Sequence, residues 1–379
     1  MPGHVISLPG LFESPPWTDW HYAGAMSDLK GAIIGYGLAG ATFHGPLISA
    51  TPGLAVATVV TGNPGRREQA LRDLPDARVL STPEELWRLA DEHDFVAVAA
   101  PNDAHVPLAE RALDAGLAVV VDKPLAPSAE EAAALVEHAR AREKLLTVFH
   151  NRRWDSDFLT LRKLMAENML GDVLRFESRF ERWRPEPRTD AWRETTGPGK
   201  GGGVLLDLGS HLVDQALQLF GPVSHVYAEI DNRRASPGDD DAFLALQHRS
   251  GAYSHLWMSA LAAAPGSRLR VLGSRAAYVV AEVDGQEDAL KSGRRPDDPD
   301  PWGVEPESRW GRLVKGDESE PVPSEPGAWP AFYTEFERAL REGGPPPVDP
   351  ADGVATLEVI DAARRSVAGL ETSSHKHLQ

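Results

Sequence analysis

The sequence contains no cysteine among its 379 residues. This absence excludes disulfide bonds, catalytic thiolates and cysteine-ligated zinc together. Basic residues are scarce relative to acidic ones, with 39 lysines and arginines against 56 aspartates and glutamates, for a net charge of −17. Such a chain repels polyanions, so we expect no nucleic-acid partner. Small neutral or phosphorylated ligands are still compatible with this charge.

Long apolar runs are also missing. No window is apolar and long enough to span a bilayer, and residues 1–25 lack the basic start and apolar centre of a signal peptide. We therefore expect a cytoplasmic protein with no membrane partner. A strand-like run begins soon after Met26, so residues 1–25 are interpreted as a loosely attached extension. With 42% hydrophobic residues, the remainder can bury the cores of two or three domains.

Between residues 29 and 149, apolar runs alternate with helical patterns. The runs are apolar throughout rather than at every second position, which is typical of strands buried on both faces. Thr82 and Ser128, each followed three residues later by glutamate, have the pattern of a capping box at a helix start. This alternation predicts a parallel doubly wound sheet, in which ligands bind at the carboxyl ends of the strands. The expected strands are 32–35, 54–60, 78–80, 95–100, 117–121 and 145–149.

A glycine-rich segment joins the first expected strand to the first helix. Its sequence, GYGLAG at 35–40, has the G-x-G-x-x-G spacing. These glycines allow a tight turn and a close backbone approach, and the helix start offers free N–H groups to a pyrophosphate. A purely structural glycine turn is the alternative, but the strand before and the helix after favour dinucleotide binding. The predicted cofactor contacts here are Gly35, Gly37, Leu38, Ala39 and Gly40.

The second half of the chain has a different pattern. Residues 175–183 alternate between polar and apolar, as in a strand with one wet face, and four strand-like runs follow at hairpin spacing. We therefore predict a Rossmann dinucleotide-binding domain with a parallel sheet at 26–150. An α+β domain with a large open, mostly antiparallel sheet should follow at 151–370, and then a tail at 371–379. Residues 283–328, rich in proline, glycine and acids, are expected to form a long surface excursion.

Asp207 and His211 lie four residues apart in an otherwise apolar helix predicted within residues 201–221, which Gly221 should end. A buried carboxylate or imidazole is costly unless it is paired or hydrogen-bonded. A helix cap and a hydrogen-bonded core histidine are the structural alternatives. Three glycines at 201–203 allow another chain or a cofactor to approach closely, which favours a functional site. No matching cluster of His, Asp or Glu occurs elsewhere, so we expect no metal.

In combination, these motifs resemble the Gfo/Idh/MocA family of oxidoreductases. Besides GYGLAG, the resemblance rests on APNDAH at 100–105, DKP at 122–124 and the spaced Gly, Asp and His of 203–211. It covers nearly all of residues 28–370, and the segment at 149–157 is most similar to the subgroup containing NADP-dependent scyllo-inositol dehydrogenase. The family more often has Glu where this chain has Asp122. Further cofactor contacts implied by the resemblance are Ala100, Pro101, Asn102, His105, Asp122 and Lys123.

The resemblance also implies a catalytic group of Lys123, Asp207 and His211. In the family, the lysine reaches the substrate beside the nicotinamide, and the Asp and His complete the group. Oxidation of a secondary alcohol needs a base for the hydroxyl proton while hydride leaves for nicotinamide C4. His211 is therefore the candidate base, Lys123 the hydrogen-bond donor to the same oxygen, and Asp207 the residue that orients them. Pro124 is a candidate for a cis peptide bond.

The expected activity is hydride transfer between a nicotinamide cofactor and a cyclic polyol or sugar, with an inositol-type substrate favoured. The alternative is a catalytically silent dinucleotide-binding sensor or regulator, because some proteins of this fold have lost catalysis. The complete Lys, Asp and His set favours the enzyme. Because the family joins subunits through the open sheet face, we expect a homodimer or homotetramer. Substrate contacts are expected from Arg152, Trp154, Trp192 and Arg193.

The segment after the second strand addresses the choice of cofactor. A Rossmann domain that prefers NAD carries an Asp or Glu about twenty residues beyond its glycines, where it binds the adenosine ribose. The segment TGNPGRR at 61–67 contains no acid. Its polar and basic side chains suit a 2′-phosphate, so we predict NADP over NAD. The alternative is that the arginines only begin the next helix on a solvated face. The predicted contacts are Thr61, Gly62, Asn63, Arg66 and Arg67.

Overall fold

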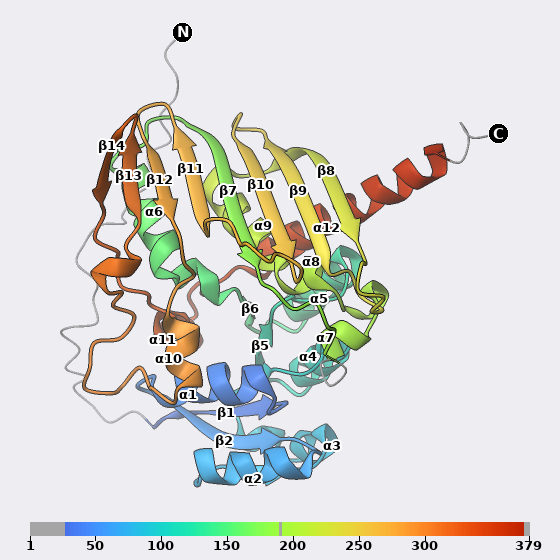
Figure 1. The fold of residues 1–379 in the computed structure, drawn as a ribbon. Helices are drawn as coiled ribbons and strands as arrows, with labels where there is room; N and C mark the ends of the chain where they lie inside the picture. Colours follow the sequence, from blue (N-terminus) through green and yellow to red (C-terminus); the bar gives the residue numbers. More distant parts are fainter. Residues whose placement is uncertain (1–26, 189–191, 375–379) are drawn as a thin grey trace.

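The computed structural model describes residues 27–188 and 192–374. The extension predicted at 1–25 and the last residues of the predicted tail, 375–379, lie outside the described residues. Two β-sheets organise the molecule, one below and one above in Figure 1. In the described part of the chain, no helix is long and apolar enough to cross a membrane.

The first sheet has six strands, all paired in parallel, in the order β3-β2-β1-β4-β5-β6. The predicted parallel doubly wound sheet is therefore confirmed. Two expected strands have the observed bounds, and the other four differ by a few residues at their ends. The order reverses between β1 and β4, which opens a ligand crevice at the carboxyl ends of these strands. The strands are β1 (Leu29–Ile34), β2 (Leu54–Val60), β3 (Arg78–Leu80), β4 (Phe95–Val98), β5 (Ala118–Asp122) and β6 (Leu146–Phe149).

The connecting helices begin largely where the capping pattern places them. Ser128 Oγ accepts a hydrogen bond from Glu131 N at 3.3 Å, as a capping box requires. Thr82 is also an N-cap, but its side chain makes no capping hydrogen bond; the Glu85 carboxylate accepts from Ser81 N at 2.8 Å instead. The helical segments are the π-helical η2 (Ala39–His44), α1 (Gly45–Ser49), α2 (Pro64–Asp73), α3 (Pro83–Trp87), α4 (His105–Asp114) and α5 (Ala129–Ala141).

The second sheet has eight strands in the order β14-β13-β12-β11-β7-β10-β9-β8. Its pairs are antiparallel except that β7 and β10 run parallel at its centre. The predicted mostly antiparallel sheet is confirmed. The strands are β7 (Val173–Glu181), β8 (Val223–Asp231), β9 (Asp241–His248), β10 (Tyr253–Ser259), β11 (Leu269–Gly273), β12 (Ala277–Val280), β13 (Arg312–Lys315) and β14 (Glu318–Pro321).

Residues 283–328 were expected to form a surface excursion, and this is wrong in part. The segment supplies β13 and β14 to the sheet and contains helix α10 (Gln286–Lys291). Asp284 and Gln286 are 4% and 1% exposed. These polar side chains are buried because backbone groups satisfy them: Asp284 accepts a hydrogen bond from Ser156 N at 2.7 Å, and Gln286 donates to Trp154 O at 3.0 Å.

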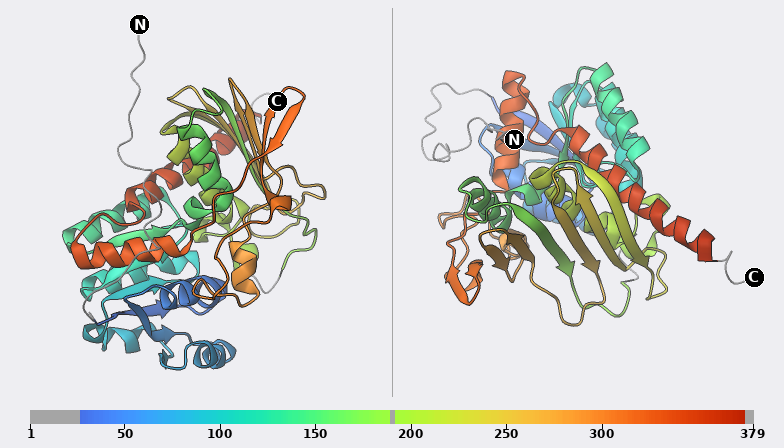
Figure 2. Two further views of the ribbon diagram at one scale, coloured as in Figure 1. Left: turned by 90° about the vertical axis from the view of Figure 1, so that its left-hand side faces the viewer. Right: turned by 90° about the horizontal axis from the view of Figure 1, so that it is seen from above.

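Helices cover one face of the second sheet, and Figure 2 shows the other face without a helix. The single helix predicted within 201–221 is two helices that meet at Leu208, and Gly221 ends the second with φ 72°. The last helix continues to Ser374, past the end predicted for the domain. Besides α10, the α-helices described after β6 are α6 (Ser156–Ala166), α7 (Trp192–Thr195), α8 (Val204–Asp207), α9 (Gly209–Phe220), α11 (Pro330–Glu342) and α12 (Pro350–Ser374).

An aromatic cluster joins the C-terminal part of the chain to the first domain. Phe336 of α11 packs edge-on against Phe95 of β4, with ring centroids 5.2 Å apart. Phe332 packs likewise against Phe149 at the end of β6, at 4.9 Å. All four side chains are 0–1% exposed. Burial of large aromatic side chains strongly stabilises such a contact, so α11 is held against the first domain.

Candidate active site

The glycine turn between β1 and η2 fits a dinucleotide. A Cβ on Gly35 would lie 2.4 Å from Ala99 O, and one on Gly40 would lie 2.0 Å from Gly35 O, so larger residues cannot pack there. A Cβ on Gly37 would instead find the Arg66 guanidinium as its nearest neighbour, at 3.6 Å. A side chain at Gly37 would therefore meet no backbone, only an exposed arginine, which leaves room for a pyrophosphate to approach the turn.

The catalytic residues predicted from distant parts of the sequence meet at the end of β5. Lys123 follows β5 directly, and its Nζ donates to Asp207 Oδ1 at 2.9 Å and to Asp207 O at 2.5 Å. Asp207 ends α8 in the second domain, so this ion pair crosses the domain boundary. Its side chains are only 12% and 16% exposed. The Lys123–Pro124 peptide bond is cis, as the sequence suggested.

The electrostatics of the site keep Asp207 charged and His211 neutral. Burial alone would raise the pKa of Asp207, but Lys123 and Arg193 beside it hold that pKa well below its usual range. Burial, reinforced by Lys123 and Arg152, lowers the pKa of His211 well below the ordinary 6.5. Nδ1 of His211 is buried and has no hydrogen-bond partner in the part of the chain that the structure describes. At neutral pH the site therefore offers a fixed ammonium–carboxylate pair beside an uncharged imidazole.

Two of the predicted cofactor residues, Asp122 and His105, hold the backbone next to Lys123 in place. Asp122 is 5% exposed, and its Oδ1 accepts a hydrogen bond from the Lys123 backbone N–H at 2.9 Å. His44 Nε2 lies 3.8 Å from the same carboxylate oxygen. His105 is fully buried between the carbonyl oxygens of Pro124 and Ala100, at 2.8 and 3.0 Å. These contacts fix the two loops that follow β4 and β5.

Asn102 links the first domain to the glycine segment of the second. Its side chain is 1% exposed, and Nδ2 donates to Gly201 O at 2.8 Å. A Cβ on Gly201, whose φ is +82°, would lie 2.5 Å from Asn102 Cβ. The 201–203 glycines thus permit a close approach between the two domains, next to the helix that carries Asp207.

The four polar residues predicted to bind the 2′-phosphate differ in whether their side chains are already buried or hydrogen-bonded within the protein. Thr61 is buried, and Asn63 Oδ1 caps α2 by accepting from Arg66 N at 3.0 Å. Arg67 donates to Ser81 Oγ at 3.0 Å and to a backbone carbonyl of β3 at 3.4 Å. Arg66 is exposed, and its guanidinium makes no hydrogen bond or ion pair within the described residues. Arg66 is therefore the arginine available to a ligand beside Gly37.

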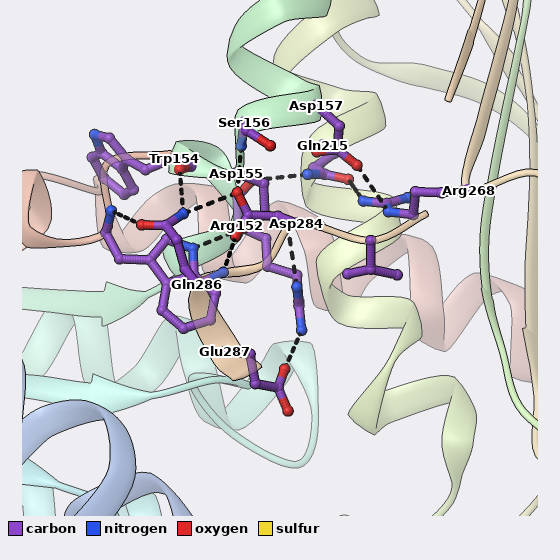
Figure 3. A network of polar contacts seen from close by, with 12 residues as sticks. Arg152, Trp154, Asp155, Ser156, Asp157, Gln215, Arg268, Asp284, Gln286 and Glu287 are labelled. Carbon is purple, nitrogen blue, oxygen red and sulfur yellow. Dashed lines mark hydrogen bonds and ion pairs between the residues drawn. The ribbon is translucent and has the colours of Figure 1, made fainter. Parts of the chain in front are cut away.

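Figure 3 shows a buried polar network around Arg152, whose charge also acts on His211. The Arg152 guanidinium, expected to contact substrate, is bound by Asp155 at 3.2 Å and Glu287 at 2.7 Å. It lies 4.7 Å from the centre of the Phe180 ring, which also packs against His211. In this position Arg152 lowers the pKa of His211 while its own charge is balanced. The network further includes Gln215, Arg268, Asp157, Asp284 and Gln286.

The other residues predicted to contact substrate divide into two groups. Trp154 packs edge-on against Phe332 at 5.8 Å, so its ring belongs to the aromatic cluster. Arg193 reaches the site: its Nε lies 2.9 Å from Asp207 Oδ1, and its guanidinium lies 4.5 Å from the Trp192 ring. The structure brings Arg193 and Lys123 to one carboxylate oxygen of Asp207.

The sequence analysis missed two residues near the site. His150, directly after β6, is 2% exposed, and neither ring nitrogen has a partner among residues 27–188 and 192–374. Its ring lies 6.4 Å from that of His211. Arg182, directly after β7, borders a small pocket together with Asp207 and Arg193. A basic residue on the apolar face of an alternating strand was the signal for Arg182. Within the described residues, no group of three or more His, Asp or Glu is arranged to hold a metal ion.

Comparison with protein families matches both halves of the chain. A model of the oxidoreductase family with an NAD-binding Rossmann fold matches residues 29–150. A model of the GFO/IDH/MocA C-terminal domain matches residues 158–279.

Comparison with individual proteins gives matches along nearly the whole chain. The chain is 39% identical to the uncharacterized oxidoreductase YdgJ of Escherichia coli (strain K12), over 93% of this chain and 98% of YdgJ. It is 34% identical to scyllo-inositol 2-dehydrogenase (NADP(+)) IolW of Bacillus subtilis (strain 168), over 93% and 97%. Among solved structures, a proposed oxidoreductase, yvaA of Bacillus subtilis, matches with a TM-score of 0.84 and 34% identity, over 91% and 97%.

Proposed function

Since the chain belongs to the Gfo/Idh/MocA family of oxidoreductases, we propose that it is an NADP-dependent dehydrogenase or reductase. Its substrate would be a secondary alcohol or ketone of a cyclic polyol or sugar, with an inositol-type compound favoured. The similarity to a scyllo-inositol dehydrogenase over almost the full length supports this substrate class. The observation that carries the proposal is the Lys123–Asp207 pair, joined across the two domains at the carboxyl edge of the parallel sheet.

Each residue of the site can carry out one part of alcohol oxidation. Bound NADP would supply the hydride acceptor at nicotinamide C4. Neutral His211 can take the hydroxyl proton, because its lowered pKa keeps it unprotonated at neutral pH. Lys123 can donate a hydrogen bond to the same oxygen and stabilise the negative charge that develops there. Asp207, ionised and bound to Lys123 through two oxygens, holds that ammonium in place.

Two parts of the first domain would hold the cofactor. The 35–40 turn would hold the pyrophosphate on backbone N–H groups at the start of the η2 and α1 helical segment. Arg66 would bind the 2′-phosphate that distinguishes NADP from NAD, because its guanidinium has no partner among the described residues and lies beside Gly37. Arg67 is occupied by Ser81 and is assigned a supporting role.

A turnover panel tests the proposed activity. Inositols and aldoses are supplied to the purified protein with NADP and with NAD, and reduced nicotinamide is followed by its absorbance. We expect turnover with at least one cyclic polyol or sugar, faster with NADP. Tight dinucleotide binding without turnover of any compound would contradict the proposal and favour a dinucleotide-binding sensor. The Lys123→Ala variant is the matched control, since it should abolish turnover while the cofactor still binds.

The open face of the second sheet supports the proposed homodimer or homotetramer. Phe243 packs with Trp257 at 4.9 Å and with Tyr227 at 6.5 Å, and Arg179 lies 3.8 Å over the Trp257 ring. Tyr227 is 50% exposed. An uncovered aromatic cluster of this kind is typical of a subunit interface. We expect light scattering to give a multiple of the chain mass and Trp257→Glu to lower it; a one-chain mass for the unmodified protein would contradict this.

A further inference from the structure

Arg182 occupies a position in the second sheet where an apolar residue is expected. Along β7, the residues that face the helices are Phe176, Ser178 and Phe180, which are 0%, 0% and 8% exposed. Arg182 continues this series by two residues, so its side chain leaves the sheet on the same face. The backbone there is fixed, because Arg182 N donates to Ser259 O at 2.9 Å and Arg182 O accepts from Ala262 N at 3.1 Å.

The neighbouring charges are already paired without Arg182. Asp207 Oδ1 accepts from Lys123 Nζ and lies equally close to Arg193 Nε, at 2.9 Å in each case. Arg234, which also lines the pocket, is bound by Glu194 at 3.0 Å and by Asp240 at 3.1 Å. These carboxylates therefore serve other cations.

Arg182 itself makes no hydrogen bond or ion pair through its guanidinium with any residue that the structure describes. Its Nε is buried and contacts no acceptor in the described residues. Arg182 is half-buried, and partial withdrawal of its guanidinium from water lowers its pKa; the nearby Asp207 opposes this shift without reversing it. In a chain whose net charge is −17, Arg182 is thus a cation near Asp207 that makes no direct contact with a carboxylate among the described residues.

We propose that Arg182 binds an anionic group of the substrate, so that the preferred substrate is an acidic sugar or polyol carrying a carboxylate or a phosphate. This inference rests on the proposed oxidoreductase function and adds a second recognition point beside the catalytic group. A planar guanidinium binds such oxyanions through two parallel hydrogen bonds. The pocket bordered by Arg182, Arg193 and Asp207 places that contact directly against the carboxylate that holds Lys123.

Matched sugars test the proposal. Glucose, glucuronate and glucose 6-phosphate share a ring and differ in the group at one carbon, and galactose with galacturonate forms a second set. For the unmodified protein we expect kcat/KM for one acidic compound to exceed that of its neutral parent by at least about tenfold, as a charge-assisted contact provides. The carboxylate and phosphate members show which anion is preferred.

Two variants locate the effect. Arg182→Ala should reduce the acidic-to-neutral ratio of kcat/KM by about 10- to 100-fold. Arg184→Ala removes an equal charge from the exposed residue two positions further on, and should leave the ratio within about threefold. A neutral compound preferred over both of its acidic partners, or a ratio that Arg182→Ala leaves unchanged, would overturn the proposal.

Calorimetry separates this inference from the proposed function. Glucose and glucuronate are titrated into the NADP-saturated protein and into its Arg182→Ala variant. Tighter binding of glucuronate that is lost in the variant would support the anion contact even if no sugar were turned over, in which case only the proposed function would fail. Turnover of neutral sugars with no preference for glucuronate in either assay would leave the proposed function intact and refute the role of Arg182.

Discussion

Cofactor preference gives the sharpest test of the nucleotide site, because the structure separates two adjacent arginines. Arg66 is exposed, and the nearest atoms to a Cβ on Gly37 would be those of its guanidinium. Arg67 is bound to Ser81 Oγ and to the Val79 carbonyl. The perturbation is therefore a pair of matched single variants, Arg66→Ala and Arg67→Ala, which remove the same charge from neighbouring positions.

The magnitudes follow from these contacts. A charge-assisted hydrogen bond to phosphate contributes about 1.5–3 kcal/mol, which corresponds to about 10- to 150-fold in affinity. Arg66→Ala should therefore lower the ratio of kcat/KM for NADP over NAD by that factor. Arg67→Ala should change the ratio by no more than about threefold. It should instead lower the free energy of unfolding by about 1 kcal/mol, because it loses hydrogen bonds to Ser81 and Val79.

Two assays are needed, since kinetics alone mixes binding with chemistry. The first compares kcat/KM for the two cofactors with one working substrate. The second measures the Kd values of NADPH and NADH by fluorescence titration, which requires no turnover. A preference for NAD in the unmodified protein would refute the prediction of NADP. A large change of the ratio in Arg67→Ala, with none in Arg66→Ala, would show that the free guanidinium is not the one that binds phosphate.

Three further predictions concern catalysis and stability. Lys123→Ala should lower kcat by about 100-fold or more while the fluorescence-measured Kd for NADPH changes little, because the proposed role of Lys123 is to stabilise the transition state; near-normal kcat would contradict that role. Because the pKa of His211 is depressed, its protonation lies well below pH 6.5, so kcat/KM for oxidation should stay level as the pH falls through 6.5; a decline centred at 6.5 would contradict this. Arg153→Ala should lower the free energy of unfolding, measured in urea, by about 3–5 kcal/mol, because it leaves the 2% exposed Asp214 unpaired; a loss below about 1 kcal/mol would refute the importance of the pair.

Much of the fold could be predicted from local pattern. Continuous apolar runs indicated strands buried on both faces, and strand–helix alternation indicated that they are parallel. The alternating pattern of 175–183 indicated a strand with one open face; β7 shows this alternation only in part, because Glu177 is buried in contact with Arg179 and Arg270. The errors arose where partners are distant in sequence. Residues 283–328 look like a surface loop by composition, yet Asp284 is buried because it accepts a hydrogen bond from Ser156, 128 residues away.

For the candidate site, too, local sequence pattern and contacts between distant segments determined different features. The sequence by itself determined which chemical groups are available: the glycine turn, the lysine after β5 and the Asp and His of the second domain. Only the tertiary structure decided their partners, because side-chain pairing depends on contacts between segments that no local period records. It placed Asp207 on Lys123, 84 residues earlier, bound Arg67 to Ser81 and left Arg66 exposed. By satisfying the neighbouring carboxylates with other cations, it also left Arg182 without a partner among the described residues.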